Sequence, residues 1–453
     1  MTTVCAMPNT KPVIDTKEKV EEVHRRAKEE SLVHVIQLGS MTMGECGEEL
    51  SDIEGMAQAG CYALSEDGKS VMNAFLFRKA MRKAKENDLL IFSHCEDISM
   101  VEGGVMNAGK RAEELGVKGI TNSVEDVIVA RDILIAKELD ATLHLCHCST
   151  ADSVRMIKDA KEAGLKVTGE VCPHHFILTD EDIPENNGIW KMNPPLRSEA
   201  DRQATIAAVA DGTVDLLATD HAPHTMEEKE LGFLDAPNGI IGLECAYGVC
   251  HKILVDGGFI SDERLIELMS TGPAELMGHD KTDITAVLDD YADAVPGDDD
   301  TKRVLDLGRV PESDQVDLVV LNTGEEWTVD PEKFHSSARN TPFGGWQVTG
   351  RPARHHHRLE AGLQPHRQGG LMDRLIEAIE RQAESKRRGT RPHRSAGAES
   401  GRGQLRRGNR RTGGGSDGSA GSPTVRRLLR IQPRHHRRSS RHRPGRQTAD
   451  RHV

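Results

Sequence analysis

Short apolar runs alternate with amphipathic segments through the first 280 residues. Six runs have the length and composition of buried strands: 31–40, 59–67, 88–97, 141–150, 165–175 and 214–224. Apolar residues recur at helical spacing in the segments between them: 16–30, 70–87, 123–139, 149–164 and 198–212. Several of these segments begin at Ser or Thr, which are good helix N-caps, and two end at Gly. The alternation predicts a parallel sheet covered by helices.

The pattern changes after residue 280. An acidic loop occupies 281–300, and the segments 302–310, 314–329 and 340–352 have the composition of short antiparallel strands. From residue 353 onward the chain consists largely of Arg, Gly, Ser and His with few core-forming residues, except for a helix-like stretch at 371–388. We therefore expect an α/β domain over 1–280, a small β domain over 281–352 and a mostly disordered tail over 353–453.

The formal net charge of −13 conceals two oppositely charged parts. The tail carries 25 Lys and Arg against 8 Asp and Glu, whereas the preceding residues carry 34 basic against 64 acidic side chains. An acidic body argues against nucleic-acid binding by that part of the chain. An RNA-binding function of the arginine-rich tail is kept as an alternative.

Cysteine usage and hydropathy indicate a reduced, cytoplasmic environment. The chain has nine Cys, an odd number, and no C-x-x-C pair. In a chain of this length such a pattern does not favour a disulfide framework. No apolar run reaches the ~18 residues that a membrane-spanning helix needs. We expect no disulfides and no membrane segment.

Ionisable side chains recur where the predicted strands end, at Asp67, His94, His147, His174 and Asp220. In an eight-stranded α/β barrel the carboxyl ends of all strands meet at one mouth, where active sites lie. Neutral imidazoles and carboxylates are the ligands of hydrolytic metal sites. The pattern predicts a metal site built from four of these residues, all except His174. The alternative is a set of polar residues at the barrel mouth that are hydrogen-bonded to loops.

Nearby histidines and cysteines leave further alternatives. His147 is preferred over His144 as a ligand because it is the last residue of its strand. Cys146 and Cys148 flank His147 and are expected to point away from it as small buried residues. The consecutive histidines at 174–175 would face opposite sides of a strand, so either one could serve the site while the other packs, and neither is favoured as a metal ligand.

Six motifs carry a resemblance to a known family: "TTVCAMPNTKP", "HCED", "HLCHCST", "EVCPHH", "KMNPPLR" and "ATDHAPH". Together they resemble bacterial dihydroorotases of the amidohydrolase superfamily, over residues 1 to about 351. Allantoinases and hydantoinases share some of these motifs. The resemblance implies a (β/α)8 barrel with a small β domain. It also implies reversible hydrolysis of the cyclic amide of dihydroorotate to N-carbamoyl-aspartate in pyrimidine biosynthesis, with two zinc ions.

The resemblance also assigns roles. Asp67 would bridge the two metals, and His94 and His147 would bind one of them. Asp220 would bind the other metal and move a proton as general base and acid. The residues that would bind substrate are Asn9, Asn193, His224, Asn238 and Gly239.

One departure from the family concerns its opening strand, which carries His-x-His. Here that pattern occurs only at 355–357, in the Arg-rich tail. The chain resembles an N-terminally truncated member, and we expect a barrel that lacks its first strand and has two unpaired edges. One metal would lose most of its ligands, so we expect little or no activity from this polypeptide.

The tail is the second departure. Residues 371–382 are similar to the first helix of orotidine 5′-phosphate decarboxylase, and we expect a reading-frame shift after residue 352. Two other functions stay open: an allantoinase, and a catalytically dead barrel that acts as a scaffold for another pyrimidine enzyme. Besides a small-molecule substrate, the partners that fit this resemblance are a second copy of the chain or a transcarbamoylase.

Overall fold

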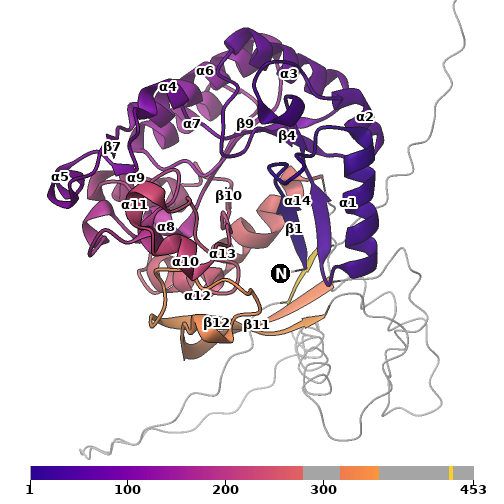
Figure 1. Cartoon of the computed structure of the whole chain (residues 1–453). Coiled ribbons are helices and arrows are strands. Elements are labelled where there is room, and N and C mark those ends of the chain that lie inside the picture. The colour runs from indigo at the N-terminus through magenta and orange to yellow at the C-terminus, as the bar shows by residue number, and fades with distance from the viewer. Residues whose placement is uncertain (1, 279–316, 357–427, 432–453) are drawn as a thin grey trace, which may run out of the picture. The chain divides into compact units, whose positions relative to one another are not determined.

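The computed structural model of the chain describes residues 2–278, 317–356 and 428–431. Its parallel strands are β1 (Thr3–Ala6), β2 (His34–Gln37), β3 (Gly39–Ser40), β4 (Ala63–Ser65), β5 (Leu90–Ser93), β8 (Leu143–Leu145), β9 (Val167–Val171) and β10 (Leu216–Leu217). They pair in the order β10-β9-β8-β5-β4-β3, and β2 pairs with β1. Leu38 alone separates β2 from β3, so the parallel order continues from β10 to β1 (Figure 1). The predicted parallel sheet is confirmed.

Helices connect the strands and lie outside them (Figure 1). They are α1 (Lys17–Glu30), α2 (Ile53–Gln58), α3 (Ala74–Glu86), α4 (Ile98–Val101), α5 (Lys110–Leu115), α6 (Ser123–Leu139), α7 (Ala151–Glu162), α8 (Pro173–Ile177), α9 (Glu199–Ala210), α10 (Met226–Lys229), α11 (Gly232–Asp235), α12 (Ala246–Cys250), α13 (Asp262–Ile266) and α14 (Gly272–Leu276). The π-helical segments His251–Val255 and Glu267–Thr271 continue α12 and α13. The predicted helix starts are partly explained by N-caps, since Asn73, Thr150 and Ser198 accept backbone N–H groups of α3, α7 and α9.

Shorter elements complete the connections. Strands β6 (Met106–Asn107) and β7 (Gly119–Ile120) form a separate parallel pair. Single 3₁₀ turns lie at Met43–Glu45, Asp180–Asp182, Gly188–Trp190 and Pro331–Lys333. No helix among the described residues is long and apolar enough to cross a membrane. All nine cysteines are free thiols, in agreement with the prediction of no disulfides.

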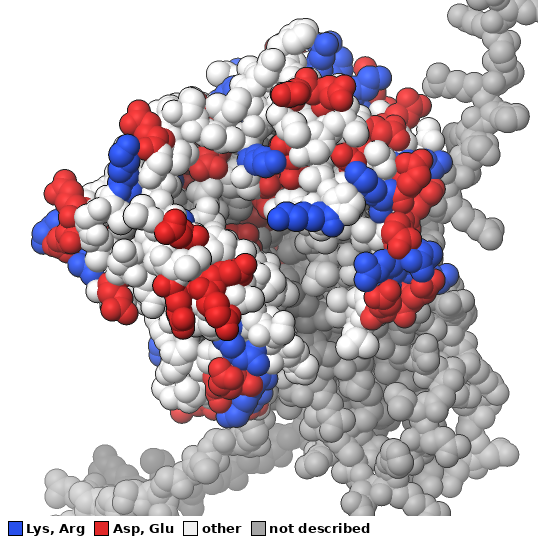
Figure 2. Space-filling model, in the orientation of Figure 1, with Lys and Arg blue, Asp and Glu red and all other residues white. Residues whose placement is uncertain are grey.

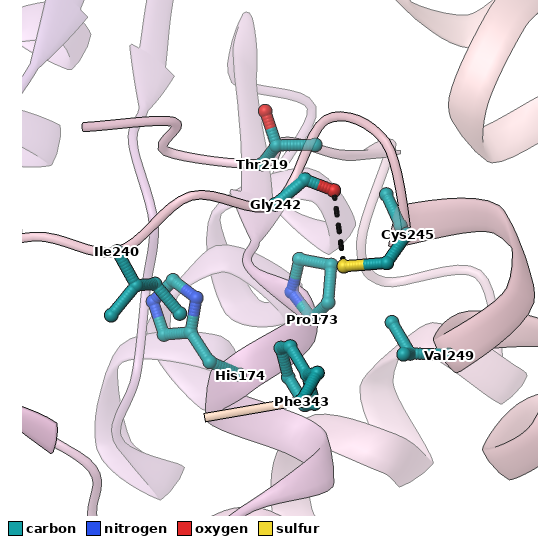
Figure 3. Close-up of a pocket in the computed structure, with 9 residues that line it drawn as sticks. Pro173, His174, Thr219, Ile240, Gly242, Cys245, Val249 and Phe343 are labelled. Carbon is teal, nitrogen blue, oxygen red and sulfur yellow. Dashed lines mark hydrogen bonds between the residues drawn. The ribbon is translucent and has the colours of Figure 1, made fainter. Parts of the chain in front are cut away.

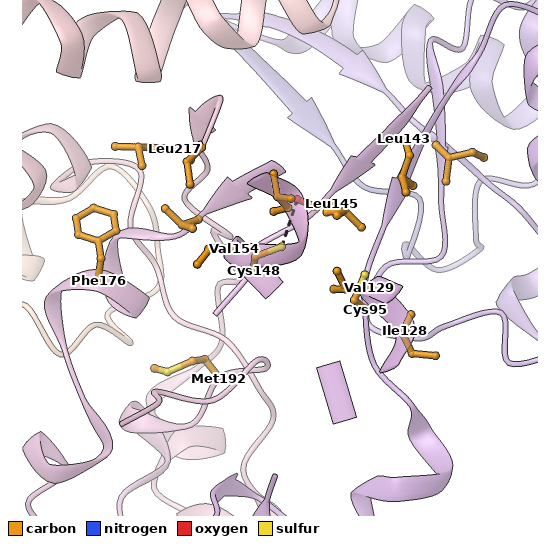
Figure 4. Close-up of a cluster of buried hydrophobic side chains, with 14 of the residues drawn as sticks. Cys95, Ile128, Val129, Leu143, Leu145, Cys148, Val154, Phe176, Met192 and Leu217 are labelled. Atoms are coloured by element: carbon orange, nitrogen blue, oxygen red, sulfur yellow. Dashed lines mark hydrogen bonds between the residues drawn. The ribbon is translucent and has the colours of Figure 1, made fainter. Parts of the chain in front are cut away.

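Both faces of the parallel strands are buried. Alternate residues such as Leu143 and Leu145 pack with Ile128 and Val129 of α6 in the larger core (Figure 4). A smaller cluster contains Phe92 of β5 and Cys146, which follows β8, together with Leu38, Ala63 and Met277. Each fully buried large apolar side chain contributes roughly 1.5–3 kcal/mol to folding. This two-sided burial explains why the strands are nearly continuous apolar runs.

Two strands at the ends of the parallel order have free backbone edges. Among the described residues, β1 pairs only with β2 and β10 pairs only with β9. Unpaired edges expose backbone N–H and C=O groups that another strand could bind. That a further barrel strand belongs between them stays a prediction.

A small antiparallel sheet follows the helical region, in the order β12-β11-β13. It contains β11 (Asp317–Thr328), β12 (Gln347–His356) and β13 (Leu428–Ile431). Gly248 of α12 allows this sheet to approach closely, because a Cβ there would lie 2.9 Å from Val348 Cγ2 and 3.1 Å from the Trp327 ring. The sheet thereby packs against α12.

The sheet reaches further along the chain than the sequence pattern indicated. Strand β12 continues past residue 352 to His356, and the apolar stretch at 428–431 pairs with β11, although both fall in the predicted tail. The acidic loop at 281–300, the strand expected at 302–310, the helix-like stretch at 371–388 and the frameshift hypothesis for the tail all lie outside the described residues.

Acidic and basic side chains are interspersed on the face shown in Figure 2. On α1, for example, Arg25 forms ion pairs with Glu22 and Glu29, all three largely exposed. Exposed pairs of this kind contribute less than about 1 kcal/mol each to stability. The described surface on this side shows no extended patch of one sign.

Candidate metal and substrate site

Three of the four predicted ligands lie together at the carboxyl ends of their strands. Asp67, His94 and His147 each offer one ligand atom, and these atoms lie within 4.8 Å of one another. Nδ1 of His94 is 2.9 Å from Nε2 of His147, and the two rings are nearly perpendicular, at 77°. The residues follow β4, β5 and β8, so three separate segments supply the group.

The backbone at His147 explains how this side chain reaches the group. Strand alternation places His144 of β8 and Cys146, which directly follows the strand, on the same side. Directly after them His147 takes a positive φ of 35°, a conformation that non-glycine residues rarely adopt. Its N–H donates to Oε1 of Glu170 at 3.2 Å, which helps to hold this conformation. Strained backbone of this kind often accompanies functional residues.

The electrostatics of the group suit a cation. Burial lowers the pKa of His147, and the nearby His94 adds to the effect. Burial also lowers the pKa of His94, but Glu96, Asp67 and Asp220 outweigh it, and the net shift is upward. Burial raises the pKa of Asp67. Two imidazole nitrogens in hydrogen-bond contact beside a carboxylate are a donor set that a divalent metal would satisfy.

Asp220 lies outside this three-residue group but interacts with it. It follows β10 with a positive φ of 44°, and its charge acts on both Asp67 and His94. Burial raises its pKa to about 6, with Glu170 adding to the shift and His94 opposing it. A carboxyl group with a pKa near neutrality can both accept and donate a proton.

Two asparagines from the predicted substrate set contact the same group. Nδ2 of Asn9 donates to Oδ2 of Asp67 at 2.6 Å. Glu96 lies 3.2 Å from Nε2 of His94 and also bonds to the Asn193 side chain. Burial raises the pKa of Glu96, but these two partners outweigh it and hold the pKa below its usual value. Hydrogen bonds of this kind orient metal-binding histidines.

The other three predicted substrate residues form a neighbouring loop contact. Nε2 of His224 lies 2.9 Å from the carbonyl oxygen of Asn238. Gly239 has a φ of 123°, and a Cβ there would lie 2.4 Å from the Cβ of Ala222, so the position requires glycine. The buried Asn340 joins the two segments, since its Nδ2 donates to the carbonyls of Ala222 and Gly239 at 3.1 Å each.

Comparison with known proteins shows the family to which the chain belongs. Residues 1–153 match a family model described as Dihydro-orotase-like. The chain is 41% identical over 351 residues to the dihydroorotase of Geobacillus sp. strain WCH70, and 40% identical to that of Bacillus cytotoxicus. Each match covers 78% of this chain and 76% of the relative. The chain belongs to the dihydroorotase family. Membership supports dihydroorotase activity, a hydrolase activity of pyrimidine biosynthesis that acts on a small molecule.

Solved structures of the amidohydrolase type share the fold. The L-hydantoinase of Arthrobacter aurescens is 25% identical, with a TM-score of 0.64 over 82% of this chain and 79% of that protein. The dihydroorotase of Saccharomyces cerevisiae in complex with 5-fluoroorotic acid is 15% identical, with a TM-score of 0.57 over 79% of this chain and 91% of that protein. The likeness is consistent with a TIM-type barrel.

The two consecutive histidines of this dihydroorotase-family chain are not in a strand. Pro173 begins helix α8, so the expectation that His174 and His175 face opposite sides of a strand is wrong. Both rings are buried and lie 4.2 Å apart, together with Cys172. His174 lines a small pocket with Thr219, Ile240 and Phe343 (Figure 3).

His144 also lies apart from the candidate metal group. It contacts Thr168 Oγ1 at 2.8 Å and Glu170 Oε2 at 3.1 Å on the inner face of the strands. Cys146 and Cys148 are buried free thiols, as expected.

Three residues that organise the site were missed by the sequence analysis: Glu96, Glu170 and Asn340. Glu96 stands in the "HCED" motif beside His94, and Glu170 alternates with Cys172 at a strand end, so both had a local signal. Asn340 had none, because its partners lie over 100 residues away in sequence.

Proposed function

We propose that the chain hydrolyses dihydroorotate to N-carbamoyl-aspartate at a centre formed by Asp67, His94 and His147, at the low rate expected when the second metal lacks its His-x-His pair. The observation that supports this most is the convergence of these three donors in a member of the dihydroorotase family. Asp220 and Asn9 lie close enough to act on the same centre, by charge and by hydrogen bond respectively.

Zinc is the proposed ion, held by Asp67, His94 and His147. A bound metal would supply Lewis-acid polarisation of the ring carbonyl and would increase the acidity of the attacking water. Nδ1 of His94 and Nε2 of His147, which lie 2.9 Å apart, are the two nitrogen atoms that would hold it. Nδ1 of His147 is buried without a hydrogen-bond partner within the described part of the chain, so the ring of His147 is bonded only through Nε2.

Asp220 is proposed as the proton carrier. In the hydrolytic direction, water adds to the ring carbonyl carbon and its proton passes to the ionised Asp220. The bond between that carbon and the ring nitrogen then breaks, and Asp220 returns the proton to the leaving nitrogen. One water is consumed, and the carboxyl group ends in its starting state. A pKa near 6 suits both transfers.

Substrate positioning is assigned to Asn9, Asn193, His224, Asn238 and Gly239. Asn9 and Asn193 contact the centre directly or through Glu96, so groups that they bind would be placed beside the metal. The contact between His224 and Asn238 is assigned to a second side of the proposed substrate site. Amide and imidazole groups at these positions can bind the carboxylate and the ring amides of dihydroorotate.

We propose one firmly held ion per chain. The described residues contain a single group in which Asp67 joins two histidines, and the sequence has no His-x-His outside 355–357. A second ion at this centre would have only Asp67, shared with the first ion, and Asp220 as ligands. Two other groups of possible donors, Cys172–His174–His175 and His144–Cys146–Glu170, are separate from it. This predicts a metal content near one rather than two.

The test uses the purified full chain. Elemental analysis gives the metal content, and ultraviolet absorbance follows dihydroorotate hydrolysis and the reverse cyclisation, with allantoin as the competing substrate. His147→Ala should remove both metal and activity, and Lys158→Met, an exposed change on α7, should alter neither. Turnover of allantoin alone would favour the allantoinase alternative. A folded protein that lacks turnover with either substrate would favour the scaffold.

A further inference from the structure

Lys229, the last residue of α10, is a fully buried lysine whose hydrogen bonds go to backbone carbonyls. Its Nζ donates to the carbonyl oxygens of Pro237 and Gly239, each at 2.8 Å, and to that of Lys191 at 3.1 Å. An ammonium group has three N–H donors, and all three are used here. Burying a cation is costly, and three hydrogen bonds are needed here to offset that cost. A lysine at such a position calls for an explanation beyond packing.

The three carbonyls belong to two segments that lead to proposed substrate residues. Pro237 and Gly239 flank Asn238, and Lys191 stands two positions before Asn193. The N–H of Gly239 donates back to the carbonyl of Lys191 at 3.0 Å, so the segments are joined directly as well.

The loop at 237–239 has a side-chain partner at each successive carbonyl. Lys229 binds the first and the third, His224 contacts the second, and Asn340 also donates to the third. Gly188 allows this packing, because a Cβ there would lie 2.4 Å from the Lys229 carbonyl oxygen. Every carbonyl of this loop is therefore held by a side chain, which indicates that its position matters.

We propose that Lys229 is a positioning residue for substrate binding: its ammonium group fixes the 237–239 loop against the segment that leads into Asn193. This inference rests on the proposed function for the roles of Asn238 and Asn193. The fixed loop would present its amide groups to substrate at little entropic cost, so the effect should fall on substrate affinity rather than on the chemical step.

The charge state of Lys229 gives the inference a signature. Burial and, to a smaller extent, repulsion from Lys191 lower its pKa to about 8, and Glu228 opposes both effects. Below that pH the ammonium serves all three carbonyls. Above it, the neutral amine keeps two N–H donors and turns a lone pair toward an acceptor oxygen. The loop should therefore loosen, and the KM for dihydroorotate should rise, as pH increases through about 8.

The experiment compares the full chain with Lys229→Met and, as a matched control, Lys158→Met, which removes an exposed lysine paired with Asp211. We expect Lys229→Met to raise KM by about tenfold or more with kcat within about threefold, and to abolish the rise of KM near pH 8. The control should behave as wild type. An unchanged KM, or a fall in kcat alone, would overturn the proposal.

Amide hydrogen exchange provides a readout that does not depend on activity. In Lys229→Met, exchange should accelerate in peptides covering 236–242 and stay unchanged over β4, β5 and β8, whereas Lys158→Met should accelerate neither. Faster exchange throughout the chain would assign Lys229 to global stability and refute the positioning role. If the wild type fails to turn over dihydroorotate, the proposed function fails, and the exchange experiment still decides whether Lys229 holds the loop.

Discussion

Replacing Glu170 by Gln should weaken metal binding through His147, although Glu170 is not itself a proposed ligand. Glu170 lies on β9 and is 6% exposed. One carboxylate oxygen accepts the N–H of His147 at 3.2 Å, and the other lies 3.1 Å from Nε2 of His144. The carboxylate therefore links the backbone of His147, held at positive φ, to a buried imidazole on the strand before it.

The expected magnitude follows from these two contacts. Hydrogen bonds to a charged group contribute about 1.5–3 kcal/mol and neutral ones about 0.5–1.5 kcal/mol, so Glu170→Gln should cost about 1–1.5 kcal/mol per contact. A loss of about 2–3 kcal/mol, if all of it falls on metal binding, corresponds to a metal site weaker by about 30- to 160-fold. Zinc affinity measured by competition with a chelating dye checks this value.

The same substitution should shift the pH dependence in a defined direction. The negative charge of Glu170 contributes to the raised pKa of Asp220, which is about 6. Removing that charge lowers this pKa, so Asp220 is ionised at lower pH. If Asp220 is the base, the acid limb of kcat/KM, measured at saturating zinc, should move to lower pH in Glu170→Gln.

A matched control is Asp201→Asn. Asp201 is also a buried carboxylate that accepts a backbone N–H, that of Ala151 at 3.0 Å, but it lies on α9 and has no contact with the metal group. This variant should leave zinc affinity and the acid limb unchanged. A folded Glu170→Gln protein with zinc affinity within about threefold of wild type and an unshifted limb would refute the reasoning.

Three further predictions follow from the same structure. Asp220→Asn should lower kcat by about 10²–10⁴ while the chain retains its metal, which rate and elemental analysis measure together; full activity would contradict the proton-carrier role. Removing metal with a chelator should abolish turnover, and adding zinc should restore it. Turnover that persists in the metal-free chain would show that Asp67 and its two histidines hold no catalytic ion. Arg197→Met should reduce the free energy of unfolding by about 3–5 kcal/mol in urea denaturation, because it leaves the buried Glu125 without its cation. An unchanged midpoint would show that this pair is dispensable.

Much of the secondary structure could be predicted from periodicity. The helix predicted at 123–139 coincides with α6, because apolar residues recur at helical spacing throughout it. The strand predicted at 165–175 was too long, since it ends at Val171 and Pro173 opens α8. Proline favours the first turn of a helix, so this boundary was present in the sequence and was overlooked.

The candidate ligands could be predicted because strand ends in a parallel sheet converge. Asp67, His94 and His147 follow three strands whose carboxyl ends point the same way, so their positions in the sequence were sufficient. The choice of His147 over His144 was less secure. Alternation alone describes a straight strand, whereas the positive φ that turns His147 toward His94 appears only in the folded backbone.

The sequence by itself therefore determined the order of strands and helices, the residues at the strand ends and the family. These features depend on local periodicity and on short motifs, and both can be read from the order of the residues alone. Only the tertiary structure decided that Lys229 and Asn340 hold the 237–239 loop and that Glu170 supports His147. Such contacts join side chains to backbone groups, often far apart along the chain, and backbone groups are the same in every residue. No pattern of residue types encodes which carbonyl a buried lysine will meet, because that depends on how the packed segments approach one another.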